Sequence, residues 1–145
     1  MIFDNMNAEQ ITKILAITEK VNFPAGEIIF KQETEPDGFY IVIEGEVSLV
    51  KINDIGKDTE LTVVGKGSFI GEISALDEKG REITAIAVSD VVAFRISKEK
   101  LDIMQKVDYP VLVKFYLSII RDINEKLRRI NDEYSRIKEK LQKNI

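Results

Sequence analysis

Short apolar segments separated by turn residues fill the chain between Glu27 and Ile96, and this rhythm constrains the fold more than any other feature. In residues 39–44, Phe39, Ile41 and Ile43 point to one face of the expected strand and the residues between them to the other. Gly45 then turns the chain into the next apolar segment. The expected strands are residues 39–44, 47–49, 61–64, 83–88 and 91–96. Strands that recur about every ten residues with glycine-rich turns predict a sandwich or barrel rather than β-α-β units.

Helices are expected on both sides of this β region. Asn7 is a favourable N-cap, and Gln10 stands at the third helical position for a capping box. We expect this first helical segment to end at residues 21–24. Ser97 can cap another short helix over residues 98–106.

A long helix is predicted from about residue 108 to the last residue, because no glycine or proline follows Pro110. Its apolar residues keep an unbroken 3-4 spacing over four heptads: Val113, Tyr116, Ile120, Ile123, Leu127, Ile130, Tyr134, Ile137 and Leu141. This spacing is the signature of a coiled coil. Phe115, Leu117 and Ile119 widen the apolar stripe at its first turns, so we expect that end to pack on the β region as well.

The partner of this stripe has two possible origins. The helix could fold back over its own β region, or it could pair with a second copy of the chain. Four heptads extend about 42 Å at 1.5 Å per residue, which is longer than a β region of this size can cover. We therefore predict a parallel homodimer, with a tetramer as the alternative because Leu tends to occupy the a positions and Ile the d positions.

The composition excludes several classes of function. The 145 residues suffice for one domain with a real core, and they include neither cysteine nor histidine. Disulfides, thiolate zinc sites, iron–sulfur clusters and cysteine or histidine catalysis are thereby excluded. There is no basic leader and no apolar run of about 20 residues. We expect a cytoplasmic protein without metal, catalytic residues or a membrane partner.

Charge is distributed unevenly along the chain. Residues 1–113 hold 12 basic and 20 acidic residues, a net charge of −8, whereas residues 114–145 hold 9 and 5, a net charge of +4. Mixed signs along the helix, as at Lys126, Arg128 and Asp132, are typical of a solvated face. This pattern is no footprint of nucleic-acid binding on its own.

A possible binding site lies around Gly71. A glycine lets backbone N–H groups approach an anion, and the turn that follows can present them as a helix N-terminus. Arg81 offers a planar, permanently charged fork for phosphate oxygens, and ionised Glu72 can accept a hydrogen bond from a sugar hydroxyl. Phosphate and sugar hydroxyl together indicate a nucleotide. The alternative is a β-hairpin with a bulge glycine and a surface ion pair between Glu72 and Arg81.

Residues 69–85, named here the cassette segment, resemble the phosphate-binding cassette of the cyclic-nucleotide-binding domain family. They read Phe-Ile-Gly-Glu-Ile-Ser-Ala-Leu, a short loop, then Gly-Arg-Glu-Ile-Thr-Ala. Residues 23–30 are similar to the family's opening strand, residues 37–47 to its central hairpin and residues 65–69 to the approach to the cassette. The resemblance implies a double-stranded β-helix, a jelly-roll-like β-roll, plus a long C-terminal coiled-coil dimerisation helix. We place the β-roll domain at residues 1–109 and the helix at residues 110–145.

The resemblance also implies roles for single residues. Glu72 would hold the ribose 2′-hydroxyl and Arg81 the cyclic phosphate, while the backbone around the short helix would complete the anion cradle. The expected ligand-binding residues are Gly71, Glu72, Ile73, Ser74, Arg81, Glu82 and Ile83. Two of them depart from the family pattern, since Glu82 stands where a small, often hydroxyl-bearing residue is usual and Ile83 where alanine is usual. Asn124 and Asn131 are polar candidates for a contact with the purine.

The predicted function is a cyclic-nucleotide-binding regulatory or sensor domain that acts as a dimer and is no enzyme. The ligand would be cyclic AMP or cyclic GMP, with cyclic AMP preferred, and no other cofactor is expected. One alternative is a degenerate member of the family that serves as a dimeric interaction scaffold without nucleotide. Another is a relative of the transcription regulators that lacks their helix-turn-helix. We do not expect direct DNA binding.

Overall fold

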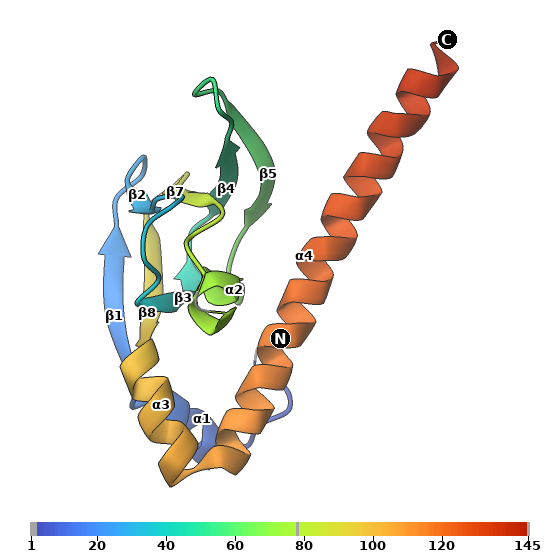
Figure 1. Cartoon of the computed structure of the whole chain (residues 1–145). Coiled ribbons are helices and arrows are strands. Elements are labelled where there is room, and N and C mark those ends of the chain that lie inside the picture. The colour runs from blue at the N-terminus through green and yellow to red at the C-terminus, as the bar shows by residue number, and fades with distance from the viewer. Residues whose placement is uncertain (1–2, 78, 145) are drawn as a thin grey trace.

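Two four-stranded antiparallel sheets form the centre of the protein, in a computed structural model that describes residues 3–77 and 79–144 (Figure 1). The first sheet has the order β1 (Thr18–Phe23), β8 (Val91–Ser97), β3 (Gly38–Glu44) and β6 (Phe69–Ile70). The second has the order β2 (Ile28–Phe30), β7 (Thr84–Ala87), β4 (Val47–Ile52) and β5 (Asp58–Val64). The prediction of a mainly β fold is confirmed.

The first strand lies where the sequence pattern indicated only the end of a helical segment. Residues 18–23 form β1, which pairs with β8 from Thr18 opposite Ile96 to Phe23 opposite Val91. Of the β1 side chains only that of Phe23 is fully buried. An edge strand with one buried side chain carries little apolar periodicity, and this strand was therefore missed.

Within the described residues four helices accompany the sheets, and the two caps predicted from the sequence are confirmed. Helix α1 (Ala8–Leu15) begins with a capping box, in which Asn7 accepts a hydrogen bond from the Gln10 N–H and the Gln10 side chain accepts one from the Asn7 N–H. The Ser97 hydroxyl accepts a hydrogen bond from the Lys100 N–H at the start of α3 (Lys98–Val107). The remaining helices are α2 (Glu72–Asp77) and α4 (Tyr109–Lys143).

Two apolar cores meet at β3. One fills the space between the two sheets, and the other lies between the first sheet and helices α1, α3 and α4. Both faces of β3 are buried, since Val42 belongs to the first core while Phe39 and Ile41 belong to the second. The rings of Phe39, Phe69 and Phe115 pack within 6.2 Å of one another, centroid to centroid. The first turns of α4 are thus packed against β6, the strand at the start of the cassette segment.

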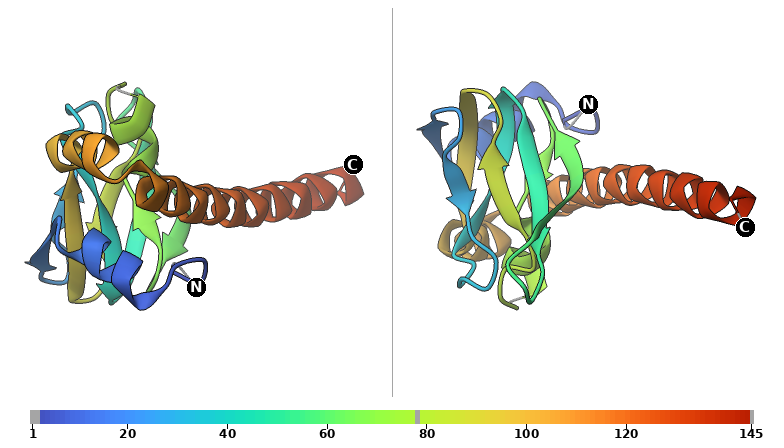
Figure 2. Two further views of the ribbon diagram at one scale, coloured as in Figure 1. Left: turned by 90° about the horizontal axis from the view of Figure 1, so that it is seen from below. Right: turned by 90° about the horizontal axis from the view of Figure 1, so that it is seen from above.

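Helix α4 is buried on one face of its first half and exposed toward its C-terminal end. Val111, Leu112, Phe115 and Ile119 are buried, whereas every side chain described from residue 131 onward is exposed. The helix therefore leaves the body and projects beyond it (Figure 2), which contradicts the alternative of a helix folded along its whole length over the β region. Within the described residues, no helix is both long and apolar enough to cross a membrane.

Candidate functional site

Gly71 connects β6 to α2 in a backbone conformation that favours glycine. Its φ is +80°, and a Cβ atom built on it would lie 2.5 Å from Nη1 of Arg81 and 3.0 Å from the Phe30 ring. The glycine is therefore required twice, by the backbone angle and by the close approach of the arginine.

Arg81 is a buried cation, with 4% of its surface exposed. Its Nη1 donates to the carbonyl of Gly71 (2.7 Å), its Nη2 donates to the carbonyl of Gly38, and the guanidinium lies 4.4 Å from the centroid of the Phe30 ring. Within the described part of the chain no carboxylate forms an ion pair with it, and its buried Nε has no hydrogen-bond partner. Burial lowers the pKa of Arg81, because a guanidinium without an ion pair is costly to bury.

Glu72 is also buried, with 2% of its surface exposed, and its cationic partner comes from α4. The Lys126 Nζ lies 2.6 Å from Oε1 of Glu72 and also donates to the carbonyl of Phe69. Burial raises the pKa of Glu72, and the charge of Lys126 opposes that rise. The alternative of a surface ion pair between Glu72 and Arg81 is therefore wrong, because both side chains are buried and Glu72 pairs with Lys126.

Asp122 attaches the same face of α4 to the start of the cassette segment. Its Oδ2 accepts a hydrogen bond from the Phe69 N–H at 3.0 Å, and its carboxylate also accepts from the Ser68 hydroxyl. One helical turn later, Lys126 lies 2.9 Å from the same Oδ2. Helix α4 thus contributes one anion and one cation to a polar cluster at the site.

A cavity of about 370 Å³ lies between α4, the cassette segment and the β4–β5 hairpin. Its polar lining comprises Thr62, Gly71, Glu72, Ser74, Glu82 and Lys126, and its apolar lining comprises Leu49, Leu61, Ile83, Ile123, Leu127 and Ile130. Such a site can take a ligand with one polar, hydroxyl-bearing part and one flat apolar part.

The structure gathers most of the predicted ligand-binding residues here. Gly71, Glu72, Ser74, Glu82 and Ile83 line the cavity. Arg81 is not among the lining residues, since its guanidinium lies directly against Gly71. The side chain of Ile73 falls outside the described residues.

The residues that depart from the family pattern lie at the cavity wall. Glu82 is exposed as well as lining the cavity, and Ile83 is half-buried. Both proposed purine contacts, Asn124 and Asn131, are exposed and are not among the lining residues.

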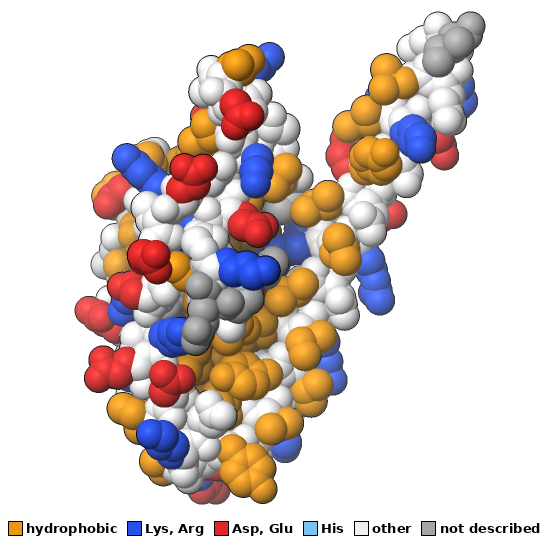
Figure 3. Space-filling model, in the orientation of Figure 1, with side chains coloured by type: hydrophobic (Ala, Val, Ile, Leu, Met, Phe, Trp, Pro, Cys, Tyr) orange, Lys and Arg blue, Asp and Glu red, His pale blue; other side chains and the backbone are white. Residues whose placement is uncertain are grey.

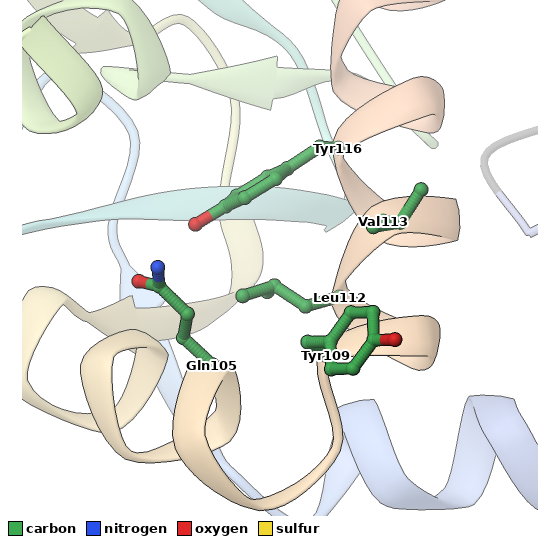
Figure 4. Close-up of a pocket in the computed structure, with 5 residues that line it drawn as sticks. All are labelled: Gln105, Tyr109, Leu112, Val113 and Tyr116. Atoms are coloured by element: carbon green, nitrogen blue, oxygen red, sulfur yellow. The ribbon is translucent and has the colours of Figure 1, made fainter.

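A second, more open hollow of about 550 Å³ lies in the angle between α3 and α4 (Figure 4). Gln105 and Tyr116 face one another across it, and Tyr109, Leu112 and Val113 complete its lining. None of the described residues that line it is charged, so the cavity next to the cassette segment is the better candidate for an anionic ligand.

Sequence reasoning missed the contribution of α4 to the site. Lys126 was assigned to a solvated face, but it is buried. Its spacing held a signal, because Lys126 follows Ile123 by three residues and precedes Ile130 by four, which places it on the apolar face of the helix. Asp122, four residues before Lys126, was the second signal, because an acidic residue at this spacing can pair with a lysine on the same helix face.

Comparisons with known proteins agree with this architecture. The family model described as "Cyclic nucleotide-binding domain" matches residues 20–107. The chain is 30% identical over 98 residues to the "Cyclic AMP receptor protein" of Thermus thermophilus, covering 68% of this chain and 45% of that protein. It is 27% identical over 118 residues to the "cAMP-dependent protein kinase regulatory subunit" of Aspergillus fumigatus, covering 74% of this chain and 27% of that protein.

A solved structure agrees with the sequence matches. The Thermus thermophilus catabolite activator protein superposes with a TM-score of 0.76 at 25% identity, covering 94% of this chain and 62% of that one. The chain spans about half the length of the receptor protein that it matches. With a family match over more than half of its residues, a relative at 30% identity and the same fold, the chain belongs to the cyclic nucleotide-binding domain family.

Proposed function

We propose that this chain binds a cyclic nucleotide, cyclic AMP or cyclic GMP, in the cavity above the cassette segment. The observation that carries the proposal is Arg81, a buried guanidinium with no carboxylate partner among the described residues and a buried Nε without a hydrogen-bond partner. A buried charge is costly unless it is paired. An anionic phosphate near Gly71 supplies the missing counter-charge.

The remaining parts of the ligand match the rest of the cavity. Glu72, whose carboxylate is paired with Lys126, accepts a hydrogen bond from a ribose hydroxyl. The apolar wall formed by Leu61, Ile123 and Ile130 buries the faces of the base. Glu82 brings a second carboxylate to the wall, and its exposure to water screens its repulsion of the phosphate.

We further propose that the protein acts as a homodimeric regulatory domain through α4, with residues 1–109 as the sensor and residues 110–145 as the dimerisation helix. Ile123, Leu127 and Ile130 belong both to the predicted heptad seam and to the lining of the cavity. A ligand there contacts the helix that pairs with the second chain. Binding would then select between arrangements of the sensor and the helix pair, driven by differential affinity for them.

Isothermal titration calorimetry with cyclic AMP and cyclic GMP tests the binding proposal. Because Arg81 also holds the carbonyls of Gly38 and Gly71, the useful variant is Arg81→Lys, which keeps the charge but loses the fork. We expect it to weaken binding by about 2 kcal/mol. Arg95→Lys is the matched control, since Arg95 is paired with Asp37, which directly precedes the neighbouring strand β3.

Two outcomes would contradict the proposal. Equal affinities of the wild-type protein and Arg81→Lys would remove Arg81 from the site. Absence of binding of either nucleotide at millimolar concentration would favour the alternative of a dimeric scaffold without a ligand.

A further inference from the structure

Lys126 forms ion pairs with two carboxylates. Its Nζ lies 2.6 Å from Glu72 Oε1 and 2.9 Å from Asp122 Oδ2, and all three side chains are almost fully withdrawn from water, with 10%, 3% and 12% of the side chains of Lys126, Glu72 and Asp122 exposed. One of these carboxylates, Glu72, is the group proposed above to accept the ribose hydroxyl. A ligand hydroxyl that bonds to this same oxygen of Glu72 competes with Lys126 for it.

Asp122 is held in a different way from Glu72. It accepts hydrogen bonds from the Phe69 N–H and from the Ser68 hydroxyl, so its carboxylate is fixed to the strand β6. These donors do not depend on Lys126 or on Glu72. Asp122 can therefore stay in place while the partner of Glu72 changes.

We propose that Asp122 is a positioning residue of the nucleotide site, which retains Lys126 when the ribose hydroxyl of the ligand binds Glu72. This inference rests on the proposed function. A buried ammonium that loses its only anion is strongly destabilising, and Asp122 removes that cost because Lys126 keeps an ion pair throughout. Helix α4 also stays attached to β6 through the same carboxylate.

The proposal predicts an effect that depends on the 2′-hydroxyl of the ligand. We would measure the affinities of cyclic AMP and 2′-deoxy-cyclic AMP, with the corresponding guanine nucleotides in parallel, for the wild-type protein and for Asp122→Asn. Asparagine keeps the size of the side chain and one oxygen for the Phe69 N–H, but it cannot pair with a cation. Glu72 is then the one carboxylate among the described residues that pairs with Lys126, beside the neutral carbonyl of Phe69.

The wild-type protein should bind cyclic AMP about tenfold or more tightly than its deoxy analogue, because a hydrogen bond to a buried charged group is lost. In Asp122→Asn the affinity for cyclic AMP should fall about tenfold, while that for the deoxy analogue changes less than about threefold. Discrimination between the two ligands would therefore shrink. Glu125→Gln is the matched control, since it makes the same change of charge at an exposed position of the same helix.

Two further variants separate positioning from structural support. Asp122→Glu keeps the carboxylate and should preserve the discrimination, and it remains informative if Asp122→Asn fails to fold. On a Lys126→Gln background, Asp122→Asn should no longer alter the discrimination, because no charge remains to be retained.

An equal loss for both ligands in Asp122→Asn, or no loss for either, would overturn the role of Asp122 while leaving nucleotide binding intact. Absence of binding of cyclic AMP and cyclic GMP to the wild-type protein would instead overturn the proposed function, and this inference with it.

Discussion

At the scale of single residues, geometry restricts Gly71 through both its backbone angle and its close approach to Arg81. We expect Gly71→Ala to destabilise the protein by about 2–3 kcal/mol, because the new Cβ adds a clash with Arg81 Nη1 to the strain of a positive φ. It should also displace the guanidinium and abolish nucleotide binding. Thermal unfolding and calorimetry measure the two effects.

Gly67 provides the matched control for this substitution. Its φ is +87°, close to that of Gly71, but a Cβ atom built on it meets no atom within 4 Å. Gly67→Ala should therefore cost only the backbone strain, about 1 kcal/mol, and leave nucleotide binding unchanged. Equal losses of stability in the two variants would show that contact with Arg81 is unimportant.

Glu72 gives the site a dependence on pH. Burial raises its pKa, so it takes up a proton at a higher pH than an exposed glutamate, although Lys126 opposes the rise and Asp122 adds to it. The ionised carboxylate is purely a hydrogen-bond acceptor and holds the ribose hydroxyl more strongly than the neutral acid does. Nucleotide affinity should therefore fall on the acidic side as the pH drops through this raised pKa.

The stability of the free protein should respond to Glu72 in the opposite direction. A carboxyl whose pKa is raised by folding contributes stability that is full below its unfolded pKa and is lost as the pH rises through its folded pKa. Acid therefore weakens binding without weakening the fold at this residue. Calorimetry and thermal unfolding, measured from below the ordinary glutamate pKa of 4.5 upward, test this. Glu72→Gln should bind weakly but with a flat pH profile.

At the scale of elements, most strands, two helix caps and the packing of the first turns of α4 could be predicted, but the polar contacts of α4 could not. Alternating apolar residues identify β3, and hydrogen-bonding side chains at Asn7 and Ser97 identify the starts of two helices, because each signal lies within a few residues. β1 has too few buried side chains for such a signal. The local spacing of Lys126 places it on the apolar face of the helix, but its partner Glu72 is 54 residues away and is not revealed by a local pattern.

Phe115 is the residue that fixes α4 on the first sheet, because its buried ring packs on Phe39 and Phe69. We expect Phe115→Ala to lower the free energy of unfolding by about 3–5 kcal/mol. Tyr109→Ala removes another aromatic ring from the same helix, but one that is 66% exposed, and should cost less than about 1 kcal/mol. Denaturant unfolding compares the two, and similar losses would contradict the assignment of Phe115 as the anchor.

At the scale of the whole molecule, the exposed apolar side chains of α4 favour the proposed pairing with a second copy of the chain. Val113, Ile120, Leu127, Tyr134 and Leu141, every a position of the predicted heptads, are each more than half exposed. Figure 3 shows apolar side chains along α4, including its part beyond residue 130, where every described side chain is exposed. A monomer would leave this stripe in water, which soluble proteins rarely do.

The proposed dimer can be tested without disturbing the ligand cavity, because the seam residues that line it are Ile123, Leu127 and Ile130, in the middle of the seam. Replacing both Ile137 and Leu141 with lysine puts like charges into the free half of the seam, where they would be buried against the second copy. The wild-type protein should have twice the chain mass of 16.5 kDa by light scattering at micromolar concentration, and this variant should have the mass of one chain with its β sheets still folded. Lysines at Ser135 and Gln142, which lie outside the seam, add the same charge and should leave the mass unchanged. A single-chain mass for the wild-type protein would refute the dimer, and a fourfold mass would favour the tetramer that Leu at a and Ile at d can form.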